Sequence, residues 1–129
     1  MSTDQQSKPK PMARDQWLEI IERAGIQQED APMRRLTQRY HVDKPVAVTI
    51  RPLIGSKKGP EVLTCSAIEV SSDGVMLRAH REVRHGAHMT LEWCEGDETF
   101  LLSGSVKHCT STVGAFKVGI ELEFPANQT

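Results

Sequence analysis

Residues 61–79 decide the fold of this chain and read EVLTCSAIEVSSDGVMLRA. Two segments of this stretch, 61–70 and 75–79, have the length and the aliphatic content of strands. Between them lies an SSDG sequence, in which the Asp-Gly pair favours a tight turn with a positive φ at Gly74. Ser71 can hydrogen-bond the backbone of such a turn. The stretch therefore predicts two strands joined by a short turn.

The strand pattern continues on both sides of this pair. Upstream, aliphatic residues occupy every second position from 46 to 50, the period of a half-buried strand, and Pro45 and Pro52 bracket the segment. Three more strands are expected downstream, at residues 89–94, 100–106 and 116–124. Six strands with short connections favour an antiparallel barrel or sandwich, so the chain is expected to be all-β.

A single short helix is expected before the strands. Residues 1–13 are mostly polar residues and proline, so they are interpreted as a disordered lead. From residue 14 to 24 apolar side chains, including Trp17, recur at helical spacing. Asp15 is expected to cap the first turn, and Gly25 to end the helix in the left-handed conformation. We expect the helix to pack its Trp17 face on the strand domain; the alternative is a helix that binds a partner.

Composition and charge argue against several classes of protein. The formal net charge of −1 is not that of a general DNA- or RNA-binding domain, which is usually basic. Charge is unevenly spread, because residues 34–58 carry seven Lys and Arg against one Asp, a net of +6. A local basic region in a neutral protein suits a small anionic ligand. No apolar run approaches the ~20 residues that span a bilayer, so we expect a soluble, cytoplasmic protein without membrane insertion.

Patterns typical of catalysis or of metal binding are missing from the sequence. The five histidines lack the paired short spacing of zinc sites. The three cysteines are expected to be reduced, structural thiols. The sequence contains neither a phosphate-binding glycine loop with Lys-Ser/Thr nor a Gly-x-Ser-x-Gly motif. We therefore expect no enzyme activity, no metal and no cofactor.

Three arginines stand just before the first expected strand, namely Arg34, Arg35 and Arg39. Arginine presents a planar fork of donors that suits phosphate oxygens or a guanine edge, and its flat face stacks on bases. In an extended chain, Arg35 and Arg39 would lie about 13 Å apart at roughly 3.3 Å per residue. The two side chains could then grip opposite ends of one small polyanion. The alternative is a solvated basic patch, because charged residues mostly face water.

Together, these arginines and the SSDG turn resemble the PilZ domain family of bacterial cyclic di-GMP receptors. The family signature is Arg-x-x-x-Arg, preferably after another Arg, followed by Asp/Asn-x-Ser-x-x-Gly. This chain has Arg35-x-x-x-Arg39 after Arg34, and it has Glu69-x-Ser71-x-x-Gly74. The resemblance runs from about residue 33 to 124, with one departure, because Glu69 stands where the family has Asp or Asn. The implied organisation is a lead (1–13), a helix and connector (14–32), a PilZ domain (33–124) and a tail (125–129).

The resemblance implies a six-stranded antiparallel PilZ-type β-barrel with a short N-terminal helix, and a binding site for cyclic di-GMP. The implied ligand-binding residues are Arg34, Arg35, Arg39, Glu69, Ser71 and Gly74. Glu69 keeps the carboxylate but adds a methylene, so we expect weakened binding. Such a receptor, as a monomer or dimer, would change conformation on binding and signal to an unidentified protein partner controlling motility or biofilm formation. The alternative is a degenerate PilZ domain that acts as a protein-interaction module, for example in type IV pilus assembly.

Overall fold

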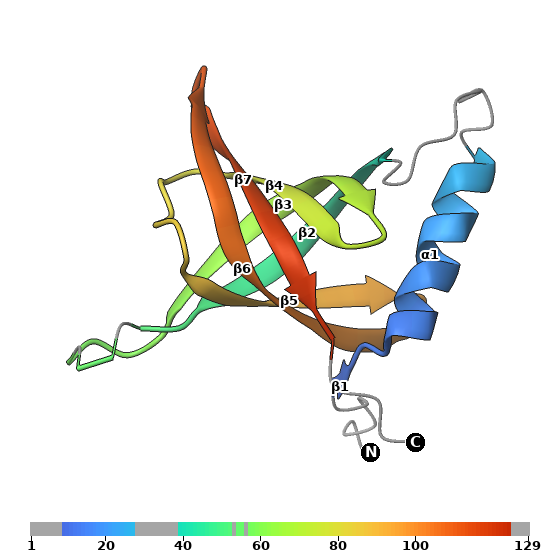
Figure 1. Cartoon of the computed structure of the whole chain (residues 1–129), viewed down its shortest axis with the longest axis horizontal. Helices are drawn as coiled ribbons and strands as arrows, with labels where there is room; N and C mark the ends of the chain where they lie inside the picture. Colours follow the sequence, from blue (N-terminus) through green and yellow to red (C-terminus); the bar gives the residue numbers. More distant parts are fainter. Residues whose placement is uncertain (1–8, 28–38, 53, 56, 125–129) are drawn as a thin grey trace, which may run out of the picture.

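The computed structural model describes residues 9–27, 39–52, 54–55 and 57–124. In these residues a helix and seven strands follow one another along the chain (Figure 1). They are β1 (Lys10–Pro11), α1 (Arg14–Gln27), β2 (Tyr40–Ile50), β3 (Glu61–Ser71), β4 (Gly74–Ala79), β5 (His88–Glu95), β6 (Glu98–Thr112) and β7 (Ala115–Glu123). Residues 1–8 of the expected lead, residues 28–38 and the expected tail (125–129) lie outside the described residues.

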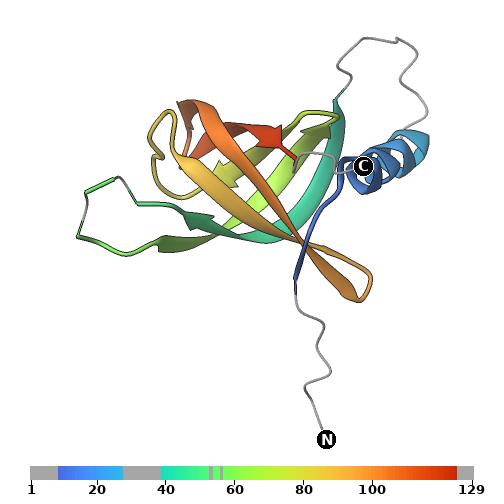
Figure 2. The same ribbon diagram turned by 60° about the horizontal axis from the view of Figure 1, so that its bottom comes forward.

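Strands β2 to β7 form a closed antiparallel barrel, as the sequence predicts. Neighbouring strands pair in the order β6-β5-β2-β3-β4-β7, and pairing between β6 and β7 closes the ring (Figure 2). A close approach of backbones marks this closure, because a Cβ added at Gly104 of β6 would lie 2.3 Å from the Glu121 carbonyl oxygen of β7. Only a residue without a side chain allows that spacing.

The barrel core follows the alternation seen in the sequence. Val46, Val48 and Ile50 of β2 are buried, as predicted for one face of a half-buried strand. Pro45 does not precede this strand but lies inside it, which corrects the expected boundary. β5 pairs with β2 only at residues 47–50, so the missing N–H of Pro45 falls where β2 has no β5 neighbour.

Helix α1 packs its Trp17 face against the barrel, which confirms that expectation. The Trp17 side chain is fully buried, and its ring meets that of Trp93 edge to face, with centroids 5.1 Å apart. The Trp17 Nε1–H also donates a hydrogen bond of 2.9 Å to the carbonyl oxygen of Ser71 at the end of β3. An aromatic pair of this kind adds about 0.5–1.5 kcal/mol to the area it buries. The helix is thus part of the folded domain (Figure 1).

Both ends of α1 differ from the sequence prediction. The helix begins at Arg14, so Asp15 lies within its first turn and is not the cap. The Ala13 N–H instead donates a hydrogen bond of 3.0 Å to Oε1 of Gln16. This is the bond of a capping box in which the side chain of the third helical residue accepts from the N-cap backbone. At the other end the helix continues through Gly25 to Gln27. Glycine inside a helix costs only about 1 kcal/mol relative to alanine, which packing elsewhere can offset.

Residues 9–13 are not the unstructured lead that their composition suggests. Strand β1 pairs in parallel with β6, with Lys10 opposite Phe100 and Pro11 opposite Leu101. Met12 then donates its N–H to the Leu101 carbonyl oxygen at 2.9 Å and buries its side chain. β7 pairs with β6 only from Ser103 onward, so β1 occupies the edge of β6 that β7 leaves open.

Within the described residues, no helix is long and apolar enough to cross a membrane.

Candidate functional site

A pocket of about 470 Å³ opens between the β3–β4 turn and the paired strands β6 and β7. Four of the six residues predicted to bind the ligand line it, namely Arg39, Glu69, Ser71 and Gly74. Nine further lining residues were not predicted as ligand-binding residues, namely the aliphatic Val70, Val75, Met76 and Ile120 together with Asp73, Lys107, His108, Gly119 and Glu121. The other two predicted residues, Arg34 and Arg35, lie outside the described residues.

Arg39 and Glu69 meet because β2 and β3 are antiparallel. Tyr40 pairs with Val70 and His41 with Glu69, which brings the start of β2 to the end of β3. The Arg39 Nη1 lies 4.0 Å from Glu69 Oε1, and the arginine side chain is 68% exposed. An ion pair this long and this exposed contributes only about 0–1 kcal/mol. The guanidinium can therefore exchange the carboxylate for another anion at little cost.

Ser71 is held from two sides. Its hydroxyl donates to Oδ1 of Asp73 at 3.1 Å, so it binds a side chain of the turn and not the turn backbone expected from sequence. Its carbonyl oxygen accepts the hydrogen bond from Trp17. Asp73 is in turn anchored to the next wall, because its own carbonyl oxygen accepts from the Leu122 N–H at 2.9 Å. The serine therefore links the pocket directly to helix α1.

Gly74 is required for a different reason from the one predicted. Its φ is not positive, so the turn does not need the left-handed freedom of glycine. A Cβ at this position would instead lie 3.0 Å from the Ile120 carbonyl oxygen and 3.5 Å from the Ser71 Oγ. The contact is with backbone, which cannot easily move aside. Glycine thus lets the start of β4 approach β7 closely at the pocket wall.

The wall formed by β6 and β7 was not predicted to be part of the site. Lys107 and His108 are neighbours in one strand, and such neighbours normally point to opposite faces. The β6–β7 register shifts between Val106 and His108, and a shift of this kind re-aims side chains, so both residues reach the pocket. The His108 ring packs over Gly119, where an added Cβ would lie 2.4 Å from Nε2.

Charges in the described part of the pocket nearly balance. Arg39 and Lys107 supply two positive charges, and Glu69, Asp73 and Glu121 supply three negative ones, a net of −1 with histidine neutral. Lys107 Nζ lies 2.9 Å from Glu121 Oε1. The hydrogen bond to Glu121, together with its charge, raises the pKa of Lys107. A dianionic ligand would therefore need these cations released from their carboxylates, or further cations from elsewhere in the chain.

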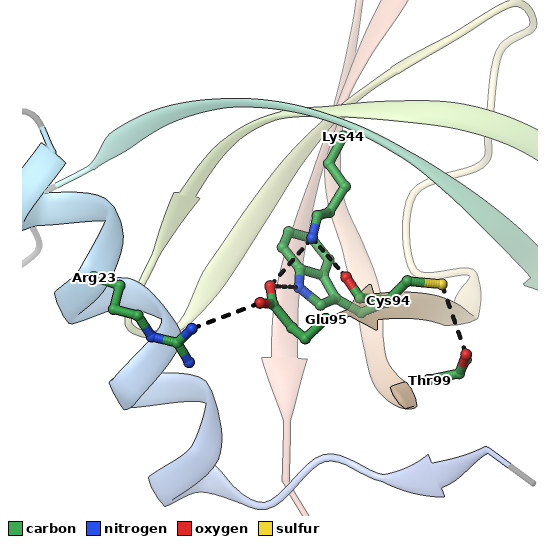
Figure 3. Close-up of polar contacts among 6 residues, drawn as sticks. Arg23, Lys44, Cys94, Glu95 and Thr99 are labelled. Carbon is green, nitrogen blue, oxygen red and sulfur yellow. Dashed lines mark hydrogen bonds and ion pairs between the residues drawn. The ribbon is translucent and has the colours of Figure 1, made fainter. Parts of the chain in front are cut away.

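A second group of charges surrounds Glu95, where α1 lies against the barrel (Figure 3). Glu95 Oε2 accepts from Trp93 Nε1 at 2.9 Å and from Lys44 Nζ at 3.1 Å, and Oε1 lies 3.9 Å from Nη1 of Arg23 on α1. The lysine also lies over the Trp93 ring, 4.9 Å from its centroid. Burial raises the pKa of Glu95, but the hydrogen bonds from Trp93 and Lys44 and the charges of Lys44 and Arg23 together outweigh it, so this pKa lies below its ordinary value. We interpret this group as structural.

Histidine and cysteine side chains do not gather into a metal centre in the part of the chain that the structure describes. No three or more His, Cys, Asp or Glu residues there are placed to hold an ion. The three cysteines, Cys65, Cys94 and Cys109, are free thiols, and burial raises the pKa of Cys65.

The closed six-stranded antiparallel barrel with its short helix is consistent with the PilZ-like fold that the sequence predicts. Among solved structures, the chain is similar to that of the Bacillus subtilis inhibitor of motility, MotI/DgrA, with a TM-score of 0.51 and 16% sequence identity. The match covers 73% of this chain and 45% of that one, so this chain spans less than half the length of its structural neighbour. At this identity the likeness shows a shared fold.

No protein-family model matches the sequence. No curated protein matches it either.

Proposed function

We propose that this chain is a bacterial cyclic di-GMP receptor, not an enzyme, whose ligand binds in the pocket between the β3–β4 turn and strands β6 and β7. The observation that carries the proposal is the meeting of two sequence motifs at one pocket. Arg39 comes from the arginine run, whereas Glu69, Ser71 and Gly74 come from the second motif some 30 residues later. The volume of about 470 Å³ lies within the range of about 300–1,000 Å³ typical of small-molecule sites.

The chemistry of the ligand suits the groups that line this pocket. Phosphate oxygens are strong acceptors for guanidinium groups, and the exposed Arg39 can leave Glu69 to bind them. The guanine edge carries N–H donors for which the Glu69 carboxylate is an acceptor. Charge-assisted hydrogen bonds of this kind contribute about 1.5–3 kcal/mol each. Arg34 and Arg35 are proposed to supply the further positive charge that the described lining lacks.

Transmission to a protein partner would pass through the contacts of Ser71. A ligand that binds the Ser71 hydroxyl competes with Asp73, and the same residue holds Trp17 of α1 through its carbonyl oxygen. A shift at the end of β3 would therefore alter the surface formed by the helix and the barrel. The likeness to an inhibitor of motility supports motility as the controlled trait, and biofilm formation is proposed only from the resemblance of the sequence to the PilZ family. We propose action in the cytoplasm, without DNA or RNA, as a monomer or dimer.

Isothermal titration of the full chain with cyclic di-GMP tests the proposal. We expect saturable binding that is lost in Arg35→Ala and in Arg39→Ala. Arg51→Ala is the matched control, because this exposed arginine follows the far end of β2 and does not line the pocket. Binding that survives in both motif variants would contradict the proposed site, and the fitted stoichiometry would give the number of ligands.

A second candidate function is a degenerate PilZ domain that does not bind the nucleotide and serves as a protein-interaction module. The observation that favours it is the net charge of −1 in the described lining, with Glu69 in place of Asp or Asn. This function predicts no heat of binding for the wild-type chain up to high micromolar ligand. A saturable titration of the wild type would exclude it.

A further inference from the structure

The pocket has a cationic group on the wall opposite the arginine motif. We propose that Lys107 of β6 binds a phosphate of the bound cyclic dinucleotide, and that Glu121 of β7 is the carboxylate from which the ligand displaces it. This inference rests on the proposed function and extends its site to a strand that the two sequence motifs do not include.

Lys107 lies at an irregularity of strand β6. The β6–β7 pairing skips from Val106 to His108, so Lys107 is the extra residue of a bulge. Bulges are over-represented beside binding sites, where they re-aim a side chain. Here the extra residue and its neighbour His108 both line the pocket. A regular strand would have directed one of the two away from it.

The ion pair between Lys107 and Glu121 is exposed to solvent. The side chains of Lys107 and Glu121 are each 54% exposed, and their atoms lie 2.9 Å apart at the pocket wall. Water and salt screen a pair that is so exposed, and such pairs have small net stability. Lysine is a compact positive charge on a flexible stem and a common phosphate ligand. The ammonium can therefore turn from Glu121 to an incoming phosphate at little cost to fold stability.

The two described cations of the pocket lie on different walls. The pocket holds two described cations, Arg39 on the β2–β3 side and Lys107 on the β6–β7 side, and each is next to one glutamate, Glu69 or Glu121. A cyclic dinucleotide carries two phosphates, so it offers one anion to each wall. With a lining charge of −1, a dianionic ligand is bound better when both cations turn to its phosphates.

Isothermal titration of full-length variants with cyclic di-GMP tests the inference. We expect Lys107→Ala to weaken binding about tenfold or more, the range of one lost charge-assisted bond. Lys107→Arg should stay within about threefold of the wild type, because it keeps the charge. Glu121→Gln should tighten binding, because the competing carboxylate is gone. Lys117→Ala is the control, since this exposed lysine of β7 does not line the pocket.

Two results would overturn the inference while leaving the proposed function intact. One is that the wild type binds cyclic di-GMP and Lys107→Ala binds it with an affinity within twofold of the wild-type value. The other is weaker binding in Glu121→Gln, which would make the glutamate a ligand contact in its own right. A wild-type chain that does not bind cyclic di-GMP overturns both the proposed function and this inference. Urea unfolding of each variant separates lost binding from lost folding.

Discussion

Two glutamates, Glu69 at the pocket and Glu95 beside α1, are buried to the same extent and yet have different surroundings. Their side chains are 27% and 26% exposed. Glu95 receives hydrogen bonds from Trp93 and Lys44 at 2.9 and 3.1 Å, and Arg23 lies 3.9 Å away. Among the described residues, the ion pair recorded for Glu69 is the one with Arg39, at 4.0 Å. Burial alone therefore does not tell a structural carboxylate from one that is available to a ligand.

The two carboxylates differ in how many hydrogen-bond donors surround them and in the type of those donors. A carboxylate can accept about four hydrogen bonds. At Glu95 two hydrogen bonds, from Trp93 and Lys44 of the barrel, use about half of this capacity, and the Trp93 ring is itself buried against Trp17. At Glu69 the ion pair among the described residues is long, at 4.0 Å, and the side chain of its partner Arg39 is 68% exposed. We infer that the contacts of Glu95 beside α1 stabilise the fold. The weak Arg39–Glu69 ion pair of the pocket, in contrast, can be exchanged for contacts with a ligand.

The largest expected effect is on the tryptophan that joins the two regions. Trp17→Ala removes a fully buried ring, its contact with Trp93 and its hydrogen bond to Ser71, and should lower the free energy of unfolding by about 3–5 kcal/mol. Urea unfolding followed by circular dichroism measures the loss. Leu18→Ala is the control, because this more exposed residue of α1 should cost no more than about 0.5 kcal/mol. Equal losses would mean that α1 does not belong to the cooperative fold.

A smaller effect separates the two glutamates directly. Glu95→Gln should lower the free energy of unfolding by about 1 kcal/mol at pH 7, because charged hydrogen bonds become neutral ones. Glu69→Gln should change it by less than about 0.5 kcal/mol, because an exposed pair is weak. Urea unfolding of both variants makes the comparison. Equal costs would remove the distinction between the structural and the available carboxylate.

Acid should abolish the difference in the free energy of unfolding between the wild type and Glu95→Gln. The pKa of Glu95 is lowered in the folded protein, so its stabilisation is fully present above the ordinary pKa of a glutamate and is lost as pH falls through the lowered value. The stability gap between the wild type and Glu95→Gln should be constant near neutral pH. The gap should begin to close as the pH falls below about 4, because this is just under the usual glutamate pKa. A gap that persists in acid would contradict the charge-based explanation.

The smallest effect concerns the reach of the pocket carboxylate. Glu69→Asp should tighten cyclic di-GMP binding by about threefold, which corresponds to roughly 0.6 kcal/mol, because the shorter side chain has less rotamer freedom to lose. Titration calorimetry of the two proteins measures it. Unchanged or poorer affinity in the aspartate variant would show that Glu69 does not weaken binding.

Most of the barrel could be predicted because alternation of side chains reports which strand face is buried. The alternation at 46–50 and the turn at 71–74 both correspond to elements of the structure. β1 could not be predicted, because two residues pairing in parallel leave no periodic pattern. The helix start was mistaken at Asp15, although Gln16 is the third helical residue and a glutamine at this position is a recognisable capping signal.

The candidate site was predictable only where both motifs contributed to it. Glu69 and Ser71 were predicted from the resemblance of their motif to the PilZ signature, and antiparallel pairing brings Arg39 to them in the structure. Lys107 and Glu121 were missed for two physical reasons. Their strands are distant in sequence from the motifs, and the bulge that turns Lys107 into the pocket depends on strand register, which single residues do not encode. Position 74 likewise requires glycine because the Ile120 backbone of β7, a strand distant in sequence, lies against it.

The pairing of β1 with β6 also bears on self-association and on how the chain can be shortened. Removing residues 1–30 would uncover the backbone of β6 near Phe100 and Leu101, as well as the hollow that Met12 and Trp17 fill. An uncovered strand edge beside exposed apolar surface is a template for pairing with another chain. Shortened forms that begin after the helix should therefore aggregate, and affinity tags belong ahead of Pro9.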